Sequence, residues 1–414
     1  MSDARPTHSR AWLIVGLLWF VACLNYLDRL MITTMRDAVK ESIPMTEAQF
    51  GLLTSVFLWV YGVLSPMAGY LADRCGRSRV IILSLFVWSA VTWLTGHAAN
   101  FEQLLIARAL MGVSEACYIP AALALIADYH QGPTRSLATG LHMSGVYAGA
   151  ALGGLGGYIA EHYHWQSAFY IFGATGVCYT IVLLAGLRDS PGSPRKADVP
   201  SAPSPARRES PIKAIGNLLR QGSFLVLLCH VGLLALAYWG INGWLPTYLR
   251  EQFKLGLGQA GLSATGYVQA ASFVGILVGG IWADSWSRRN VKARALVPFV
   301  GFCAAAPALF CAASSNTLSV ALAGLVIFGL ARGFSDANMM PVLCQIVDSR
   351  YRATGYGLLN CISCLVGGAT IYLSGILRDT HFNLAIVFQI AAAGLGLAAL
   401  LMLALKPRSD LETQ

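Results

Sequence analysis

The sequence predicts an all-α polytopic membrane protein with twelve transmembrane helices in two pseudo-symmetric six-helix halves. Of the 414 residues, 56% are hydrophobic and 12% are charged, whereas soluble domains carry about 25% charged residues. A transmembrane helix needs about 20 mostly apolar residues, and such runs recur from Ala11 to Leu405 with only short polar breaks. This composition excludes a single soluble core and makes lipid the expected solvent of the outer surface.

The first apolar run, from Ala11 to Thr33, begins the series of spans. It is long enough to cross the bilayer and further apolar runs follow it, so we interpret it as a transmembrane helix and not as a cleaved signal peptide. The twelve spans are expected to be centred near Phe20, Val60, Ser89, Glu115, Ala150, Gly176, Leu236, Ala271, Ala305, Phe328, Val366 and Ala393.

Positive charge is distributed unevenly along the chain. With a cytoplasmic N-terminus, 21 of the 29 lysine and arginine residues fall in inside segments and five fall outside, as the positive-inside rule predicts. The net charge of +9 therefore reflects membrane topology and not nucleic-acid binding. The remaining three, Arg29, Arg108 and Arg332, lie within apolar spans. We expect an integral multi-pass protein of a bacterial cytoplasmic membrane with both termini cytoplasmic.

A polar segment rich in proline separates the spans six and six. It contains six prolines between Arg188 and Gly222, a composition typical of a linker that cannot bury a core. We therefore divide the chain into an N-terminal half at 1–187, a cytoplasmic linker at 188–222 and a C-terminal half at 223–414.

Two internal echoes support this division. The first has Gly, Asp and Arg at identical spacing after the second and eighth spans, with Gly69, Asp73, Arg74, Gly76 and Arg77 in one copy and Gly280, Asp284 and Arg288 in the other. The second echo pairs Gly112, Glu115, Ala116 and Pro120 in the fourth span with Gly333, Asp336, Ala337 and Pro341 in the tenth. Gly69 and Gly280 would permit close helix approach, and the charges of the first echo would pair in one end state. These residues are candidates for conformational gating, and the alternative is that their charges only set topology.

The first echo resembles the loop signature G-x-x-x-D-[RK]-x-G-[RK] of the major facilitator superfamily. That resemblance implies two six-helix halves, a binding site near the midplane and rocking between the two faces of the membrane. Within the superfamily, two groups are similar in their motifs: the organic anion:cation symporters of sugar acids and the Spinster-like lysolipid transporters. The motifs shared with both are Asn25-Tyr26-Leu-Asp28-Arg29, Arg108-x-x-x-Gly112-x-x-Glu115 and Trp244-Leu-Pro246-Thr-Tyr248-Leu.

The presence of an ionisable side chain inside a transmembrane helix needs a physical reason, because its insertion into the bilayer costs about 2.5 to 3.5 kcal/mol of free energy. Arg108 and Glu115 are seven residues apart and therefore share one helix face, about 10 Å apart along the axis. Asp28 and Arg29 are neighbours and point about 100° apart. We expect Asp28 to hold Arg108 while Arg29 turns toward a water-filled cavity.

The resemblance to the anion symporters implies a role for each of these groups. Arg29 would anchor the substrate, since an arginine fork binds both oxygens of a carboxylate. Asp28 and Glu115 would couple protons, with Arg108 as their electrostatic regulator. The hydroxyls of Tyr26 and Tyr61 would face the substrate. The alternative is an interhelix salt-bridge network that only holds the bundle together.

The remaining candidates each have a structural alternative. Arg332 and Asp336 stand at i, i+4 in the tenth span and form either a self-neutralising pair or a site of the C-terminal half. The others could relay protons or bind substrate, or serve only interhelix hydrogen bonding: His142, Tyr147, His230, Asn242, Gln269 and Asn360.

Other patterns are interpreted as packing or as chance. The glycines at 145–157 predict close helix packing in the fifth span, and the cysteines are read as packing residues. Gly256-x-Gly258-x-x-Gly261 follows no strand, so it does not indicate dinucleotide binding. No P-loop, zinc signature or nucleophile elbow is found, so we expect no cofactor, no metal and no enzyme activity.

These observations predict a secondary transporter, a proton-coupled symporter of a small organic anion such as a carboxylate or sugar acid. The expected partners are the anionic solute, protons and membrane lipid, for a monomer that does not bind nucleic acid. The alternative within transport is a Spinster-like lysophospholipid or amphiphile transporter. A solute sensor and a membrane enzyme that uses Glu115 and Asp28 as acid and base are the readings outside transport.

Overall fold

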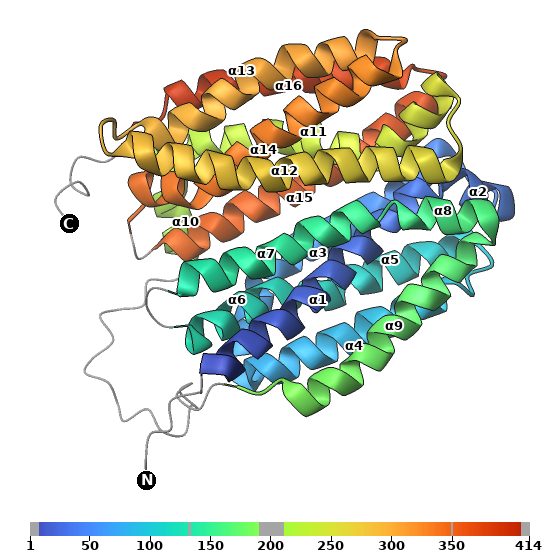
Figure 1. Ribbon diagram of the computed structural model, residues 1–414, viewed down its shortest axis with the longest axis horizontal. Coiled ribbons are helices and arrows are strands. Elements are labelled where there is room, and N and C mark those ends of the chain that lie inside the picture. Colours follow the sequence, from blue (N-terminus) through green and yellow to red (C-terminus); the bar gives the residue numbers. More distant parts are fainter. Residues whose placement is uncertain (1–7, 131–133, 190–210, 349–350, 407–414) are drawn as a thin grey trace.

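The computed structural model describes residues 8–130, 134–189, 211–348 and 351–406, and every regular element in these ranges is a helix (Figure 1). The first half consists of α1 (His8–Thr34), α2 (Arg36–Ser42), α3 (Glu47–Cys75), α4 (Arg77–Thr95), α5 (Phe101–Glu115), α6 (Tyr118–Tyr129), α7 (Arg135–Leu152), α8 (Leu155–His162) and α9 (Trp165–Gly186). The second part consists of α10 (Pro211–Leu219), α11 (Gly222–Phe253), α12 (Leu257–Ser287), α13 (Ala293–Ser314), α14 (Leu318–Ile346), α15 (Arg352–Asp379) and α16 (Leu384–Leu403).

The described residues contain eleven helical segments that are long and apolar enough to cross a membrane. One further crossing, the fifth in chain order, is made by α7 and α8, which follow one another through a turn at Gly153 and Gly154. It brings the number of crossings to twelve. The fourth crossing is bent within its length, because α5 ends at Glu115 and α6 begins at Tyr118. The all-α, twelve-span architecture predicted from the sequence is confirmed, and the chain is an integral multi-pass membrane protein.

Figure 1 shows α1 to α9 as one bundle and α11 to α16 as a second bundle beside it. The bundles meet along two seams, where α3 lies against α15 and where α7 and α8 lie against α12. The short helix α10 lies at the end where α1 begins and α16 ends. Following the charge asymmetry, we call this the inner end and the opposite end, which carries α2, the outer end.

Glycines of the fifth crossing allow backbones to touch, as predicted. A Cβ atom added at Gly149 would lie 2.0 Å from the carbonyl oxygen of Cys23 in α1, so no larger residue fits there. A Cβ atom at Gly154 would lie 2.7 Å from the Cα of Leu262 in α12 of the other half. Small residues therefore bring the fifth crossing into contact both with its own half and with the opposite half.

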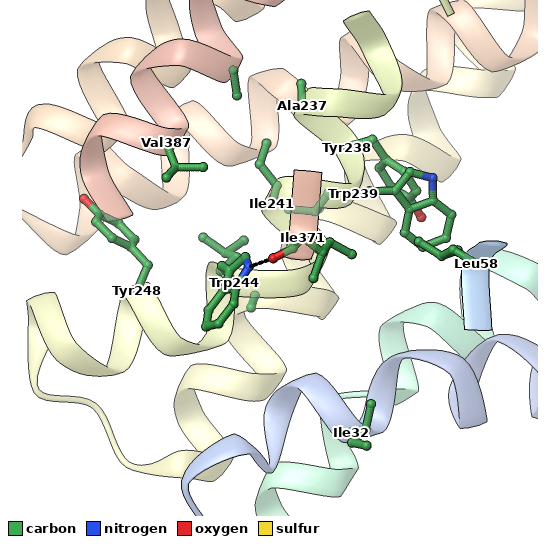
Figure 2. Close-up of a cluster of buried hydrophobic side chains, with 14 of the residues drawn as sticks. Ile32, Leu58, Ala237, Tyr238, Trp239, Ile241, Trp244, Tyr248, Ile371 and Val387 are labelled. Carbon is green, nitrogen blue, oxygen red and sulfur yellow. Dashed lines mark hydrogen bonds between the residues drawn. The ribbon is translucent and has the colours of Figure 1, made fainter. Parts of the chain in front are cut away.

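The centre of the apolar core lies on α11, where every residue from Ala237 to Leu249 is buried. A helix that is buried on all sides must be surrounded by other helices. Figure 2 shows Trp244 of α11 donating its indole N–H to the carbonyl of Ile371 in α15, at 3.1 Å. The same view places Ile32 and Leu58 of the first half beside this cluster. The core is thus shared by the two halves.

Charged side chains join the halves at the outer end. The Nε of Arg378 in α15 lies 3.5 Å from Oε2 of Glu47 at the start of α3, and Arg36 of α2 pairs with the same Glu47. Arg378 also pairs with Glu251, with Nη2 and Oε1 2.7 Å apart. We call this network the outer gate, and its members are Arg36, Asp37, Lys40, Glu47, Arg250, Glu251 and Arg378.

Hydrogen bonds extend this closure inward along α3 and α15. Asp379 at the end of α15 accepts two backbone N–H groups at the start of α3, at 2.8 and 3.0 Å. Further along α3 toward the middle of the membrane, the hydroxyl of Ser55 donates to the carbonyl of Gly368 at 2.6 Å, and the indole of Trp59 donates to the carbonyl of Leu365 at 3.1 Å. The seam between α3 and α15 is therefore closed from the outer end toward the middle.

One gating prediction is wrong in its position. A Cβ atom at Gly280 would lie 3.9 Å from the Cβ of Ala337, an ordinary contact that does not require glycine. Close approach occurs at the neighbouring Gly279, where a Cβ atom would lie 2.7 Å from the Cα of Phe334. The two residues differ by about 100° around the helix, which is why an adjacent glycine meets a different neighbour. Arg288 is exposed just beyond the end of α12.

The other predicted gating residues stand at the inner ends of α3, α4 and α12 or at Gly76 between α3 and α4. Three of them lie outside the described side chains, namely Gly69, Asp73 and Arg74. Gly76 joins α3 to α4 with a φ of +89°, which favours glycine. Arg77 pairs with Asp128 of α6, within its own half. Asp284 pairs with Arg294 of α13, with Oδ1 and Nη2 3.0 Å apart.

We predict that Arg378→Gln loosens the outer gate. The substitution removes a charge that pairs with both Glu47 and Glu251, so the outside-closed state should lose on the order of 1 kcal/mol, roughly a fivefold change in population. Spin labels at His164 and Thr317, one on each half, should show a longer or broader distance distribution. Lys254→Asn is the control, because it removes an outer charge with no ion pair among the described residues and asparagine tolerates its left-handed backbone. An unchanged distribution in Arg378→Gln would show that the gate does not hold the halves.

Candidate functional site

The centre of the first half contains a buried ion pair. Arg29 of α1 lies with its Nη2 3.1 Å from Oε2 of Glu115 at the end of α5. The same nitrogen donates to Oδ1 of Asn25 one turn earlier, at 3.4 Å. The exposed fractions of Arg29 and Glu115 are 2% and 0%. Two of the predicted site residues, from spans distant in the sequence, are thus brought into direct contact.

Three aromatic rings surround the Arg29 guanidinium. Its Cζ lies 4.5 Å from the ring centroids of Tyr26 and Tyr61 and 4.8 Å from that of Phe57. Phe57 and Tyr61 are one turn apart on α3 and are stacked with centroids 5.9 Å apart. The negative faces of aromatic rings stabilise a cation, so the charge of Arg29 is held by three rings and one carboxylate.

Arg108 does not pair with Asp28, contrary to the contact expected from the sequence. Its Nε donates to the carbonyl of Leu53 at 3.2 Å, and its Nη2 lies 3.5 Å from the carbonyl of Arg29. Asp28 instead accepts a long 3.4 Å hydrogen bond from the hydroxyl of Thr92 in α4. The side chain of Arg108 is fully buried. Backbone carbonyls therefore take the place that the sequence interpretation gave to a carboxylate.

Phe57 links the two arginines of the first half. The Cζ of Arg108 lies 4.8 Å from the Phe57 centroid, the same distance as that of Arg29. Arg108 and Glu115 are both fully buried on α5, as expected for residues that share one helix face. Arg29, Arg108 and Glu115 thus form one compact cluster around the ring of Phe57.

Glu115 stands at a break in its transmembrane span. It is the last residue of α5, and the helix resumes only at Tyr118. A carboxylate buried at this depth is costly unless a cation is close. Arg29 supplies that cation from α1. A substrate that engaged Arg29 would leave the Glu115 carboxylate in an unfavourable field.

Several polar atoms of the cluster have no hydrogen-bond partner among the described residues. They are Asp28 Oδ1, Glu115 Oε1, Arg29 Nε and Asn25 Nδ2. Buried polar groups are normally satisfied, and exceptions are often functional. Two free carboxylate oxygens can take up protons, and a free guanidinium nitrogen can donate to an anionic ligand.

A second charged cluster faces the first from the other half. Arg332 and Asp336 of α14 form the expected i, i+4 pair, with Nη2 and Oδ2 3.4 Å apart. Tyr147 of α7 donates to the same Oδ2 at 2.9 Å, so the predicted residue Tyr147 contacts a carboxylate across the boundary between the halves. The Cζ of Arg332 lies 3.4 Å from the ring centroid of Tyr238 in α11.

The two clusters differ in exposure. Asp28, Arg29, Arg108 and Glu115 are each at most 2% exposed, whereas the side chains of Arg332 and Asp336 are 14% and 30% exposed. Tyr26 is half-buried at the edge of the first cluster. In this outside-closed arrangement, the charges of the first half are covered and those of the second half are accessible.

Four of the other predicted residues form hydrogen bonds within the protein, and for Asn360 no partner is found among the described residues. His142 Nε2 lies 3.0 Å from the hydroxyl of Tyr118, and His230 Nδ1 donates to the carbonyl of Ala398 at 2.9 Å. Asn242 donates to the backbone carbonyl of Tyr238, four residues before it, at 2.7 Å. Gln269 Nε2 lies 3.4 Å from the Asn242 oxygen, and Asn360 is half-buried on α15.

Sequence reasoning did not single out Phe57, Tyr238 and Thr92, each of which contacts a predicted residue. A signal existed for two of them. Phe57 precedes Tyr61 by four residues and Tyr238 precedes Asn242 by four, so each shares a helix face with a candidate. Thr92 gave no local signal, because its contact with Asp28 depends on how α4 packs against α1.

A separate groove of about 670 Å³ lies between α12 and α14. Its lining is almost entirely apolar and contains none of the predicted site residues. Tyr267 and Val274 on this surface are each 49% exposed, so in a membrane the groove would face lipid. Its character suits an acyl chain better than a charged solute.

Comparison with known proteins places the chain among transporters. A family model described as Major Facilitator Superfamily matches residues 18–371. The chain is 26% identical to a probable sulfoacetate transporter of Cupriavidus necator, with 95% of this chain and 94% of that protein covered. It is 25% identical to a probable galactarate/D-glucarate transporter of Escherichia coli, with 93% and 92% covered.

Spinster proteins are similar to the chain as well. It is 27% identical to protein spinster homolog 1 of Xenopus tropicalis, with 88% of this chain and 72% of that protein covered. A bacterial homolog of the human lysosomal transporter Spinster, solved in an inward-facing and unoccupied conformation, has a TM-score of 0.78 at 23% identity. That comparison covers 98% of this chain and all of the other, and it shows a shared fold.

We predict that Phe57→Leu destabilises the protein more than a matched loss of a buried ring elsewhere. Phe57 faces two guanidinium groups, and each cation–π contact is worth about 0.5 to 2 kcal/mol. Phe328→Leu is the control, because Phe328 is also fully buried and has no aromatic or cationic contact among the described residues. Thermal unfolding in detergent, followed by tryptophan fluorescence, should give a lower Tm for Phe57→Leu. Equal Tm values would mean that the ring contributes only its apolar volume.

Proposed function

The chain belongs to the Major Facilitator Superfamily, and from that premise we propose that it is a proton-coupled symporter of a small organic anion that works by alternating access. The observation that carries this proposal is the arrangement of Arg29, whose guanidinium is held between three aromatic rings and the carboxylate of Glu115. A transporter of this superfamily binds its solute near the midplane between the halves.

The substrate class follows from the chemistry of Arg29. A guanidinium is charged at any physiological pH and presents a planar fork that matches the two oxygens of a carboxylate. Its Nε has no partner among the described residues, and its Nη2 is shared between Glu115 and Asn25. A carboxylate or sulfonate could replace Glu115 as the partner without leaving the arginine uncompensated.

Proton coupling follows from the balance of buried charges. The first half buries two arginines, Arg29 and Arg108, and two carboxyl groups, Asp28 and Glu115. A substrate anion added to this set leaves one negative charge in excess in an apolar interior, where charge is costly. Uptake of a proton by Glu115 restores the balance, so anion and proton bind together and are released together.

The alternation would use the outer gate. In the present arrangement, the outer ends are joined by ion pairs and the charges of the first half are covered. Opening of the outer gate, with closure at the inner ends of α3, α4 and α12 near Gly76, Arg77, Asp284 and Arg288, would expose the site to the outside. Each half would move largely as a rigid body, because each also has a buried cluster made only of its own residues.

A second candidate function is favoured by the apolar groove between α12 and α14. A lysophospholipid or similar amphiphile has an acyl chain that would fit such a surface and an anionic head group that would suit Arg29. The relatives include both Spinster proteins and organic acid transporters. The charged site favours the small anion, because a guanidinium enclosed by three rings and a carboxylate can exchange that carboxylate for a compact anionic group.

The two candidates are separated by transport assays in proteoliposomes. Uptake of labelled sugar acids and of sulfoacetate is measured with and without an imposed pH gradient, and transbilayer movement of a lysophospholipid is measured in the same preparation. Gradient-stimulated accumulation of an anion supports symport. Lysophospholipid movement without anion uptake would favour the amphiphile transporter instead.

We predict that Arg29→Lys severely impairs uptake of an anionic substrate. The ammonium group keeps the charge but lacks the fork and the flat face that stacks on aromatic rings. The loss should be about 1.5 to 3 kcal/mol in binding, roughly 10- to 100-fold in apparent affinity. Arg294→Lys provides a control in an exposed pair on α13. Wild-type uptake kinetics in Arg29→Lys would remove this residue from the substrate site.

We predict that Glu115→Gln spares anion exchange but abolishes uphill accumulation. Glutamine keeps the size and polarity of the side chain and mimics its neutral form, so substrate can bind and cross while no proton is carried at this position. Exchange of internal for external substrate should continue in proteoliposomes, and a pH gradient should no longer drive accumulation. Retained gradient-driven accumulation would exclude Glu115 from the coupling path.

A further inference from the structure

The pair formed by Arg332 and Asp336 is loosely held for a structural salt bridge. The only ion-pair contact between them is one 3.4 Å distance from Nη2 to Oδ2. That oxygen also accepts the hydroxyl of Tyr147 at 2.9 Å, so the carboxylate divides its interaction between two donors. The other terminal nitrogen of Arg332, Nη1, is buried and has no hydrogen-bond partner among the described residues.

The guanidinium of Arg332 is nevertheless fixed in place. Its Cζ lies 3.4 Å from the ring centroid of Tyr238, so the planar group lies on the face of the ring. Tyr238 is buried on α11, which is enclosed by neighbouring helices, and is seen beside Trp239 in Figure 2. A stacked guanidinium with an unused N–H edge is preorganised to bind a planar anion.

Arg332 and Arg29 stack on rings of one shared core. The Cζ of Arg29 lies 4.5 Å from the ring centroid of Tyr61, and the Cζ of Arg332 lies 3.4 Å from that of Tyr238. Tyr61 and Tyr238 belong to the same buried cluster, which both halves share. The helix α1, which carries Arg29, lies against α11, and α11 lies against α14, which carries Arg332.

The two arginines have equivalent surroundings. Arg29 has aromatic faces and Glu115, and Arg332 has the face of Tyr238 and Asp336. Glu115 and Asp336 are also the corresponding residues of the repeated motif in the fourth and tenth spans. Each half thus presents one stacked arginine that is neutralised by the acidic residue of the repeat.

We propose that Arg332 binds a second anionic group of the substrate, so that the transported solute is a compact dianion held between Arg29 and Arg332. This inference rests on the proposed anion transport and specifies its substrate class. The second anionic group displaces Asp336 from Arg332, as the first displaces Glu115 from Arg29. A dicarboxylate or a carboxylate with a sulfonate has the required two charges, and a monoanion can satisfy only one arginine.

The proposal is tested by binding of matched anions to the purified protein. D-glucarate is compared with D-gluconate, and sulfoacetate with isethionate, because each pair differs by replacement of one carboxylate by an alcohol. The wild-type protein should bind the dianion of at least one pair more tightly. Arg332→Gln should weaken dianion binding about tenfold or more and change monoanion binding little.

Two further variants separate a binding role from a structural one. Asp336→Asn removes the competing carboxylate and should strengthen dianion binding, because Arg332 no longer has to be released. Arg332→Lys keeps the charge for folding but should bind the dianion more weakly than the wild type. Arg289→Gln, on the exposed loop after α12, is the charge-matched control and should leave binding unchanged.

The outcomes distinguish this inference from the proposed function. Equal weakening of dianion and monoanion by Arg332→Gln, or equal binding of both by the wild type, overturns the dianion while anion transport stands. If Arg332→Gln and Asp336→Asn both lower Tm without changing the dianion preference, the pair only stabilises the fold and the inference fails. If the wild type binds no anion of either pair but moves lysophospholipid, the proposed function fails as well.

Discussion

The ion pair between Arg29 and Glu115 is the constraint on which the centre of the molecule depends. A buried charge is costly in a bilayer unless it is neutralised and hydrogen-bonded. The pair joins α1 to the end of α5, and the rings of Tyr26, Phe57 and Tyr61 close around it. Neither residue can change its partner without a substitute of the same charge. Under the proposed function, that requirement would make this contact selective for anions and protons.

The outer gate gives this local exchange a consequence for the whole molecule. The halves share a core on α11 and are joined at the outer end by Arg378, Glu47 and their neighbours. Among the hydrogen bonds that cross between the halves, the one from Tyr147 to Asp336 ends on a charged residue of the second cluster. A solute that displaced Asp336 would alter this crossing contact directly, which links occupancy of the site to the relative position of the halves.

Much of this organisation was predictable from the sequence, because it depends on local patterns. The length of the apolar runs predicted the number of crossings, and the uneven placement of lysine and arginine predicts their orientation. Seven-residue spacing placed Arg108 and Glu115 on one face, and both are buried together. The repeated motif identified Glu115 and Asp336 as corresponding positions, and each has an arginine partner. Helical periodicity and bilayer thickness are sufficient for these inferences.

Partnership between distant helices was decided only by the tertiary structure. The sequence favoured Asp28 as the partner of Arg108, yet Glu115 pairs with Arg29 while Arg108 is held by backbone carbonyls. The outer gate likewise brings together residues from α2, α3, α11 and α15 that no local pattern connects. The sequence alone determined which charges lie inside the membrane. Which of them touch was set by the rotation of each helix about its own axis, since about 100° separates one residue from the next.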